Sequence, residues 1–198
     1  MRLIGITGGV GAGKSEILNW LEKQYNCVVL KADEAANRIK EPGERCYDSL
    51  VELLGPEVLS ENGKIDRGKM AERIFGDKEL LVQVNAIIHP AVKEYILKQI
   101  QEKRAEGCTD YFFLEAALLI EEGYGEILDE LWYIRADETV RRRRLRESRD
   151  YSDEKIDRIL RSQLPDQEFL ANCSFVIDNS HEIEEAYRQI KEKLGDTR

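Results

Sequence analysis

The chain has 198 residues, and its 39 acidic and 30 basic side chains give a formal net charge of −9 at pH 7. This length is enough for one mixed α/β domain with an insertion, and the acidic balance argues against a nucleic-acid partner. No apolar run is as long as a membrane span, and no basic-then-apolar leader precedes the first strand, so we expect a cytoplasmic protein with no membrane partner.

A short apolar strand over residues 3–7 leads into a glycine-rich turn and then into a helix over residues 15–24. Backbone N–H groups of such a turn can curl around phosphate oxygens, because glycine tolerates the required φ angles. Lys14 would contact the β- and γ-phosphates, and the Ser15 hydroxyl would be a ligand of Mg²⁺. The structural alternative is an ordinary glycine-rich connection, but the pattern favours a nucleotide-phosphate site. The turn reads Gly8-Gly9-Val10-Gly11-Ala12-Gly13-Lys14-Ser15, which matches G-x-x-x-x-G-K-S.

Four further apolar runs are typical of buried strands, and helical patterns lie between most of them. They cover residues 27–30, 111–115, 131–134 and 175–177, and an amphipathic helix over 182–194 follows. This alternation predicts an α/β fold with a doubly wound, mostly parallel five-stranded sheet. Ligands of such a sheet bind at the carboxyl ends of the strands, where the glycine-rich turn also lies.

Residues 38–104 interrupt the alternation, because they hold only helical patterns and are too long for a simple crossover. We expect a helical insertion that forms one wall of a second substrate pocket, with plain structural padding as the alternative. The core would then comprise residues 1–37 and 105–198. Turn signals predict breaks between the helices of the insertion at Pro42-Gly43, Gly55-Pro56, Asn62-Gly63 and His89-Pro90. At His89-Pro90 the backbone should leave the helical region, because the residue before a proline is disfavoured there.

Two carboxylates follow predicted strands and are candidates for chemistry. Asp33 comes after the second strand, where it could accept a proton from an attacking hydroxyl or hold Mg²⁺ through water. It could equally cap a helix that starts at Glu34, and the spacing leaves both readings open. Glu115 ends the third strand and could lie beside the metal.

Six arginines lie between residues 141 and 149, at positions 141, 142, 143, 144, 146 and 149. In a phosphoryl-transfer enzyme, arginines on a closing lid neutralise charge as the phosphoryl group moves. The alternative is a solvated helix paired with Asp137, Glu138, Glu147 and Asp150, which would account for most of them. We expect a lid over residues 138–152 in which two or three arginines face the active site.

Taken together, these pieces resemble the dephospho-coenzyme A kinase family over nearly the whole chain. The resemblance implies a nucleotide-binding core, a helical substrate domain and a lid. It also implies phosphorylation of the ribose 3′-hydroxyl of dephospho-coenzyme A by ATP, the last step of coenzyme A synthesis. Besides the glycine-rich turn, the matching pieces are Ala32-Asp33, Pro42-Gly43, Asn62 to Arg67, Ile88-His89-Pro90, Leu118-Leu119 with Glu121, and Val176 to Asn179.

From the residues and the resemblance we expect ATP and Mg²⁺ as cofactors and a monomer or weak homo-oligomer. Asp33 and Lys14 would be catalytic together with the lid arginines Arg142 and Arg146, and Glu115 would join Ser15 at the metal. Glu16 would extend the nucleotide site, and Arg38, Pro42, Gly43, His89, Pro90 and Leu118 would contact the acceptor. The chain departs from the family pattern at Glu16, Lys31, Ala117, Val140 and Phe169.

Two other functions share these sequence features. A nucleoside or nucleotide kinase would have the same loop, insertion and lid. A nucleotide-binding regulator would bind ATP without transferring a phosphoryl group, although the acidic Asp33 argues against it.

Overall fold

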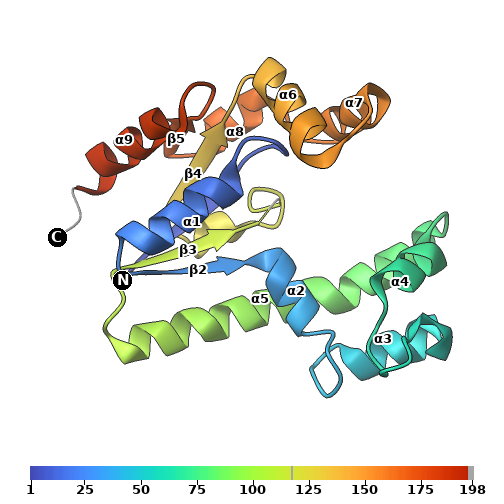
Figure 1. Cartoon of the computed structure of the whole chain (residues 1–198). Coiled ribbons are helices and arrows are strands. Elements are labelled where there is room, and N and C mark those ends of the chain that lie inside the picture. The colour runs from blue at the N-terminus through green and yellow to red at the C-terminus, as the bar shows by residue number, and fades with distance from the viewer. Residues whose placement is uncertain (117, 196–198) are drawn as a thin grey trace. The chain divides into compact units, whose positions relative to one another are not determined.

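The computed structural model describes residues 1–116 and 118–195, and over these residues five strands form one sheet in the order β2-β3-β1-β4-β5 (Figure 1). The pairings of β1 with β3, of β1 with β4 and of β4 with β5 are all parallel. The predicted α/β class, the parallel sheet and the positions of its strands are confirmed; the departure at Ala117 lies outside the described residues. The strands are β1 (Arg2–Thr7), β2 (Cys27–Lys31), β3 (Tyr111–Glu115), β4 (Glu130–Arg135) and β5 (Phe175–Asp178).

The chain divides into two compact units, one of residues Met1–Val29 with Gly107–Arg198 and one of residues Leu30–Glu106. The first unit carries α1 (Lys14–Gln24), η2 (Tyr124–Glu126), α6 (Glu138–Arg149), α7 (Asp153–Arg161), α8 (Asp166–Asn172) and α9 (Ile183–Leu194). The second carries α2 (Ala32–Arg38), α3 (Tyr47–Leu54), η1 (Pro56–Val58), α4 (Arg67–Ile74) and α5 (Lys78–Glu106), and it contains the predicted helical insertion.

In the first unit, the core lies between the sheet and the helices α1 and α9. Helix α1 buries Ile17, Leu18 and Leu21 on one face, as its spacing predicts. These side chains share one apolar cluster with Ile4, Ile6, Phe113, Trp132, Ile134, Ile177, Ala186 and Ile190. Burial of these strand and helix side chains in one cluster fixes the carboxyl end of β1. The start of α1, which follows it, is therefore fixed as well.

The predicted break at His89-Pro90 is wrong, because both residues lie inside the 29-residue helix α5. Pro90 has no N–H to donate to the carbonyl of Ala86, and its ring crowds that carbonyl, which would ordinarily kink or end a helix. Here the apolar face continues on both sides of Pro90, from Leu80 and Val84 to Ile96. Burial of this face offsets what proline costs the helix. The Cys46 thiol also donates to the carbonyl oxygen of Ile87, with the two atoms 3.7 Å apart, which ties α5 to the segment before α3.

Within the part of the chain that the structure describes, none of the helices combines the length and the apolar character needed to cross a bilayer.

Candidate active site

The glycine-rich turn, here called the phosphate loop (residues 8–15), joins the carboxyl end of β1 to α1. Gly8, Gly11 and Gly13 have φ angles of 145°, 83° and 92°, which side-chain-bearing residues rarely adopt. Gly13 is the N-cap of α1 in a left-handed conformation, and its carbonyl accepts from the N–H groups of Glu16 and Ile17. The predicted strand, turn and helix are therefore present, with the helix N-terminus at the loop.

Neighbouring groups leave no room for side chains in this loop. A Cβ atom on Gly8 would lie 2.4 Å from the carbonyl oxygen of Ile134, and one on Gly13 would lie 2.3 Å from Nδ2 of Asn179. A Cβ atom on Gly9 would meet Nη2 of Arg141 at 2.3 Å. The glycines are thus required both by backbone conformation and by the groups that pack against the loop.

Lys14 lies folded along the phosphate loop. Its Nζ donates to the carbonyl oxygen of Gly8 at 2.7 Å and lies 3.8 Å from Oε1 of Glu115. Glu115 ends β3, and β3 pairs with β1 so that Glu115 is level with Ile6. Both side chains are largely shielded, with 15% of Lys14 and 17% of Glu115 exposed. The parallel register therefore brings the predicted phosphate cation and the predicted metal-side carboxylate together.

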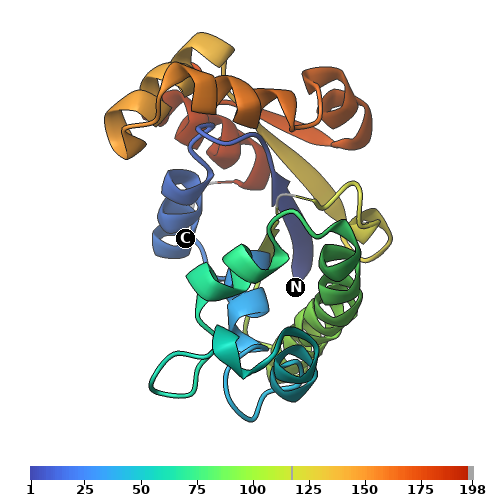
Figure 2. The same cartoon turned by 90° about the vertical axis from the view of Figure 1, so that its right-hand side faces the viewer.

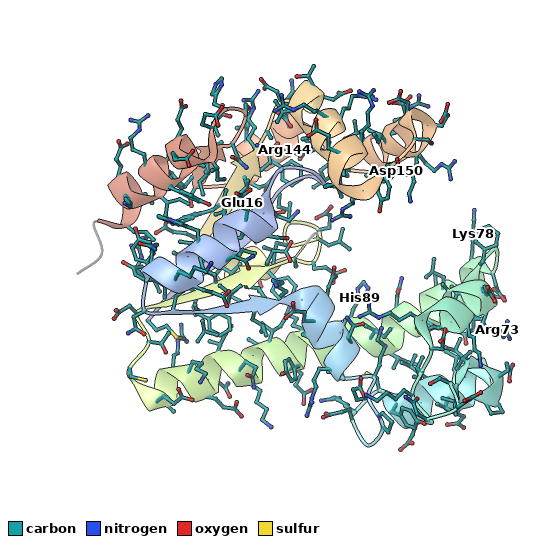
Figure 3. The ribbon with its side chains drawn as sticks, viewed as in Figure 1. Glu16, Arg73, Lys78, His89, Arg144 and Asp150 are labelled. Atoms are coloured by element: carbon teal, nitrogen blue, oxygen red, sulfur yellow. The ribbon has the colours of Figure 1, made fainter. Side chains whose placement is uncertain are left out.

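Two of the six arginines contact the phosphate loop, and they are Arg141 and Arg144. Arg141 donates from Nε to the carbonyl oxygen of Val10 at 2.9 Å, and it also bonds to Oε1 of Gln163. Arg144 donates to the carbonyl oxygen of Ala12 at 3.4 Å. Burial lowers the pKa of Arg141. Figures 1 and 2 both show α6 beside the loop, and Figure 3 labels Arg144 on this helix.

Arg142 and Arg146, which we predicted to be catalytic, join α6 to α7 in this structure. Arg142 bonds to Glu138 and to Asp157, and Arg146 bonds to Asp153. The hydrogen bond from Arg142 lowers the pKa of the Asp157 carboxyl. Of the carboxylates that the sequence suggested as partners, Glu138 is used by Arg142; the other two partners come from α7. The catalytic roles of Arg142 and Arg146 stay predictions.

Asn179 is a loop contact that sequence reasoning did not assign to the site. It follows β5, is 1% exposed, and donates from Nδ2 to the carbonyl oxygen of Ala12 at 2.7 Å. Its Oδ1 and the Thr7 hydroxyl are buried and have no hydrogen-bond partner among the described residues. The only available sequence signal was its place in the family motif after the last strand.

In the second unit, Asp33 lies exposed in the first turn of α2. The helix begins at Ala32, and Lys31 is its N-cap without a side-chain hydrogen bond. The reading of Asp33 as the cap of a helix from Glu34 is therefore wrong. The helix dipole favours a carboxylate in the first turn. Such a carboxylate makes no capping bond here, so its oxygens are available to accept a proton.

The predicted acceptor residues fall on both units. Arg38 pairs with Glu44 at 3.1 Å, and Pro42 and Gly43 lie in the exposed loop after α2. His89, labelled in Figure 3, and Pro90 lie on α5. Leu118 belongs to the first unit and is 47% exposed.

Glu16 and Ser15 are both exposed in the first turn of α1. Burial and the Glu16 carboxylate raise the pKa of Tyr187 on α9. The described residues hold no cluster of three or more His, Cys, Asp or Glu side chains fit for a metal. The Ser15 hydroxyl and the Glu115 carboxylate are nevertheless the hard oxygen donors that Mg²⁺ takes, and phosphate and water commonly supply the rest.

A parallel α/β sheet whose first strand enters such a loop, with arginines of a following helix on the loop backbone, defines a P-loop kinase. Shikimate kinase from Bacteroides thetaiotaomicron shares this fold, with a TM-score of 0.53 at 13% identity and 98% of each chain covered.

A sequence model of the dephospho-CoA kinase family matches residues 2–185, and the chain belongs to this family. The dephospho-CoA kinase of Carboxydothermus hydrogenoformans is 35% identical over 95% of this chain and 90% of that protein. The one from Shouchella clausii is 34% identical over 98% of both. A crystal structure of a Thermus thermophilus protein superposes with a TM-score of 0.81 at 28% identity, covering 98% of this chain and 96% of that one. The chain is thus a kinase, as predicted.

Proposed function

We propose that this kinase transfers the γ-phosphoryl group of ATP to the 3′-hydroxyl of dephospho-coenzyme A, giving coenzyme A and ADP. Membership of the dephospho-CoA kinase family over residues 2–185 carries the proposal. The phosphate loop supports it, since its glycine conformations, Lys14 and the helix N-terminus are those that bind nucleotide phosphates.

In the proposed reaction, Asp33 accepts the proton of the ribose 3′-hydroxyl. The freed oxygen bonds to the γ-phosphorus, and the bond from this phosphorus to the β–γ bridging oxygen breaks, so that ADP leaves. Lys14 turns from the Gly8 carbonyl to the phosphates, where its charge is needed most. Ser15 and Glu115 would hold Mg²⁺, which neutralises the charge that develops on the phosphate oxygens.

The arginines divide into two proposed roles. Arg141 and Arg144 hold the loop backbone through the carbonyl groups of Val10 and Ala12. Arg142 and Arg146 are proposed to contact the transferring phosphoryl, for which their bonds to Asp157 and Asp153 would have to open. Because α7 carries both carboxylates, the lid helices α6 and α7 would change contacts together.

Acceptor contacts are proposed for Arg38, Pro42, Gly43, His89, Pro90 and Leu118. We further propose that the enzyme is a cytoplasmic monomer or weak homo-oligomer, since the family's reaction is between small soluble molecules.

The experiment is to incubate purified protein with ATP and to measure ADP with and without dephospho-coenzyme A and Mg²⁺. We expect ADP to form only when all three are present, together with a product heavier than the acceptor by one phosphoryl group. A protein that binds ATP but forms no ADP with this acceptor would be the regulator considered above, and the proposal would be wrong.

A further inference from the structure

Two cations of the second unit are held close to each other and to Asp33. Lys40 follows α2, one residue after the buried Ile39, and is half-buried. Arg67 is the first residue of α4 and is exposed. Neither has a carboxylate oxygen within 4.0 Å among the described residues, whereas the nearby Arg38 and Lys64 do.

Two contacts hold the segment after α2 against the turn that leads into α4, and a third closes the segment on itself. Glu41 pairs with Lys64, with Oε2 and Nζ 2.6 Å apart. The hydroxyl group of Tyr47 donates to the carbonyl oxygen of Gly63. The N–H of Cys46 donates to the carbonyl oxygen of Ile39 at 3.0 Å, which closes the loop from 39 to 46. Lys40 and Arg67 are therefore kept on facing segments by bonds that involve neither of them.

Electrostatics agree with this placement. Burial and the Arg67 guanidinium lower the pKa of Lys40, while the Asp33 carboxylate opposes that shift. Asp33 lies in the first turn of α2, and Lys40 follows two residues after the helix ends at Arg38. Two like charges beside each other, one of them half-buried, are unfavourable without an anion between them.

We infer that Lys40 and Arg67 bind the 5′-diphosphate of the acceptor. This inference rests on the proposed function. In dephospho-coenzyme A the diphosphate is attached to the same ribose that carries the 3′-hydroxyl, so an anion site near Asp33 would present that hydroxyl to the carboxylate. The Arg67 guanidinium can donate two parallel hydrogen bonds to phosphate oxygens, and Lys40 supplies a compact charge. Both are thus positioning and binding groups for the acceptor and have no role toward ATP.

The test compares Arg67→Gln with the matched control Arg73→Gln. Arg73 is an exposed cation in the last turn of the same helix and is labelled in Figure 3. Initial rates at saturating ATP give kcat/KM for dephospho-coenzyme A and for adenosine, which lacks the diphosphate. Loss of a charge-assisted hydrogen bond predicts a fall of about 10- to 100-fold for Arg67→Gln with dephospho-coenzyme A. We expect Arg73→Gln, and both variants with adenosine, to stay near the wild-type values.

A second variant separates the charge of Arg67 from the planar shape of its guanidinium. Arg67→Lys retains the charge but not the planar fork, so its activity should lie between those of the wild type and Arg67→Gln. Binding of dephospho-coenzyme A in the presence of a non-hydrolysable ATP analogue should weaken in the same order. If Arg67→Gln behaves like Arg73→Gln, or loses as much with adenosine, the inference is wrong while the proposed function stands. If the wild type does not phosphorylate dephospho-coenzyme A at all, the proposed function itself is wrong.

Discussion

The guanidinium of Arg141 donates to the backbone carbonyl of Val10, with Nε and the oxygen 2.9 Å apart. This bond joins the lid helix α6 to the phosphate loop, and the same side chain lies where a Cβ of Gly9 would be. Asn179 holds the carbonyl of Ala12 from the end of β5. The loop is therefore shaped from two sides by side chains that use its carbonyl oxygens.

Replacing Arg141 tests whether this contact positions the loop. We expect Arg141→Ala to lower kcat/KM for ATP about 10- to 100-fold, since a charge-assisted hydrogen bond to the loop is lost. Steady-state kinetics with varied ATP check this. Arg143 on the same helix is exposed and serves as the control, so Arg143→Ala should be close to wild type. Equal effects of the two changes would remove Arg141 from the site.

Lys14→Ala should lose most of kcat while the protein stays folded. The ammonium lies on the Gly8 carbonyl and beside Glu115, outside the apolar core, so packing changes little. Removing a donor that stabilises charge in the transition state costs about 10²–10³-fold in kcat. Steady-state kinetics check the loss of kcat, and thermal unfolding checks that the variant stays folded. Lys23→Ala in the last turn of α1 is the control. Near-normal turnover would contradict the assignment.

Asp33→Asn should abolish most transfer without weakening ATP binding and with little loss of stability. The amide keeps the shape but cannot accept the proton, and loss of a general base lowers the rate about 10²–10⁴-fold. Because Asp33 makes no capping bond, the change removes only a weak helix-dipole interaction, and the melting temperature should fall little. The neighbouring Glu34→Gln, which breaks only an exposed pair with Lys31, is the control. A loss below about tenfold would rule out the role of base.

Gly13→Ala should destabilise the protein as well as the site. A Cβ there would lie 2.3 Å from Nδ2 of Asn179, and the residue has a φ of 92°. A left-handed conformation forced on a side-chain-bearing residue costs about 1–3 kcal/mol, to which the displacement of Asn179 adds. Denaturant unfolding compares it with Gly125→Ala, since no atom lies within 4 Å of a Cβ at Gly125 among the described residues. Equal unfolding free energies of these two variants would show that the loop does not depend on the contact.

Local patterns predicted the strands and the phosphate loop, because continuous apolar runs and the glycine spacing fix them without reference to distant residues. The buried face of α6 could also have been predicted, since Leu145 is the only apolar residue between 141 and 149 and is 1% exposed. Arg141 and Arg142, four and three positions before Leu145, lie on its side of the helix. Which arginines reach the phosphate loop depends on where the loop lies, and helix periodicity does not contain that information.

Other features depend on contacts that no local pattern contains. Helix α5 continues through Pro90 because its apolar face is buried on both sides of the proline. Asn179 reaches Ala12 across 167 residues of sequence. Asp33 was ambiguous because the same residue types serve as helix caps and as first-turn acids, and only the observed start of α2 separates these cases.

The choice of acceptor tests the central claim most directly. At saturating ATP and Mg²⁺, kcat/KM is measured for dephospho-coenzyme A, AMP and adenosine, and the position of the new phosphate is read by nuclear magnetic resonance. Contacts remote from the hydroxyl orient it for reaction, so we expect dephospho-coenzyme A to exceed the truncated acceptors by about 100-fold or more. The phosphate should be on the ribose 3′-oxygen. Equal or higher kcat/KM with AMP or adenosine, or phosphate on another oxygen, would contradict the account and favour a nucleotide kinase.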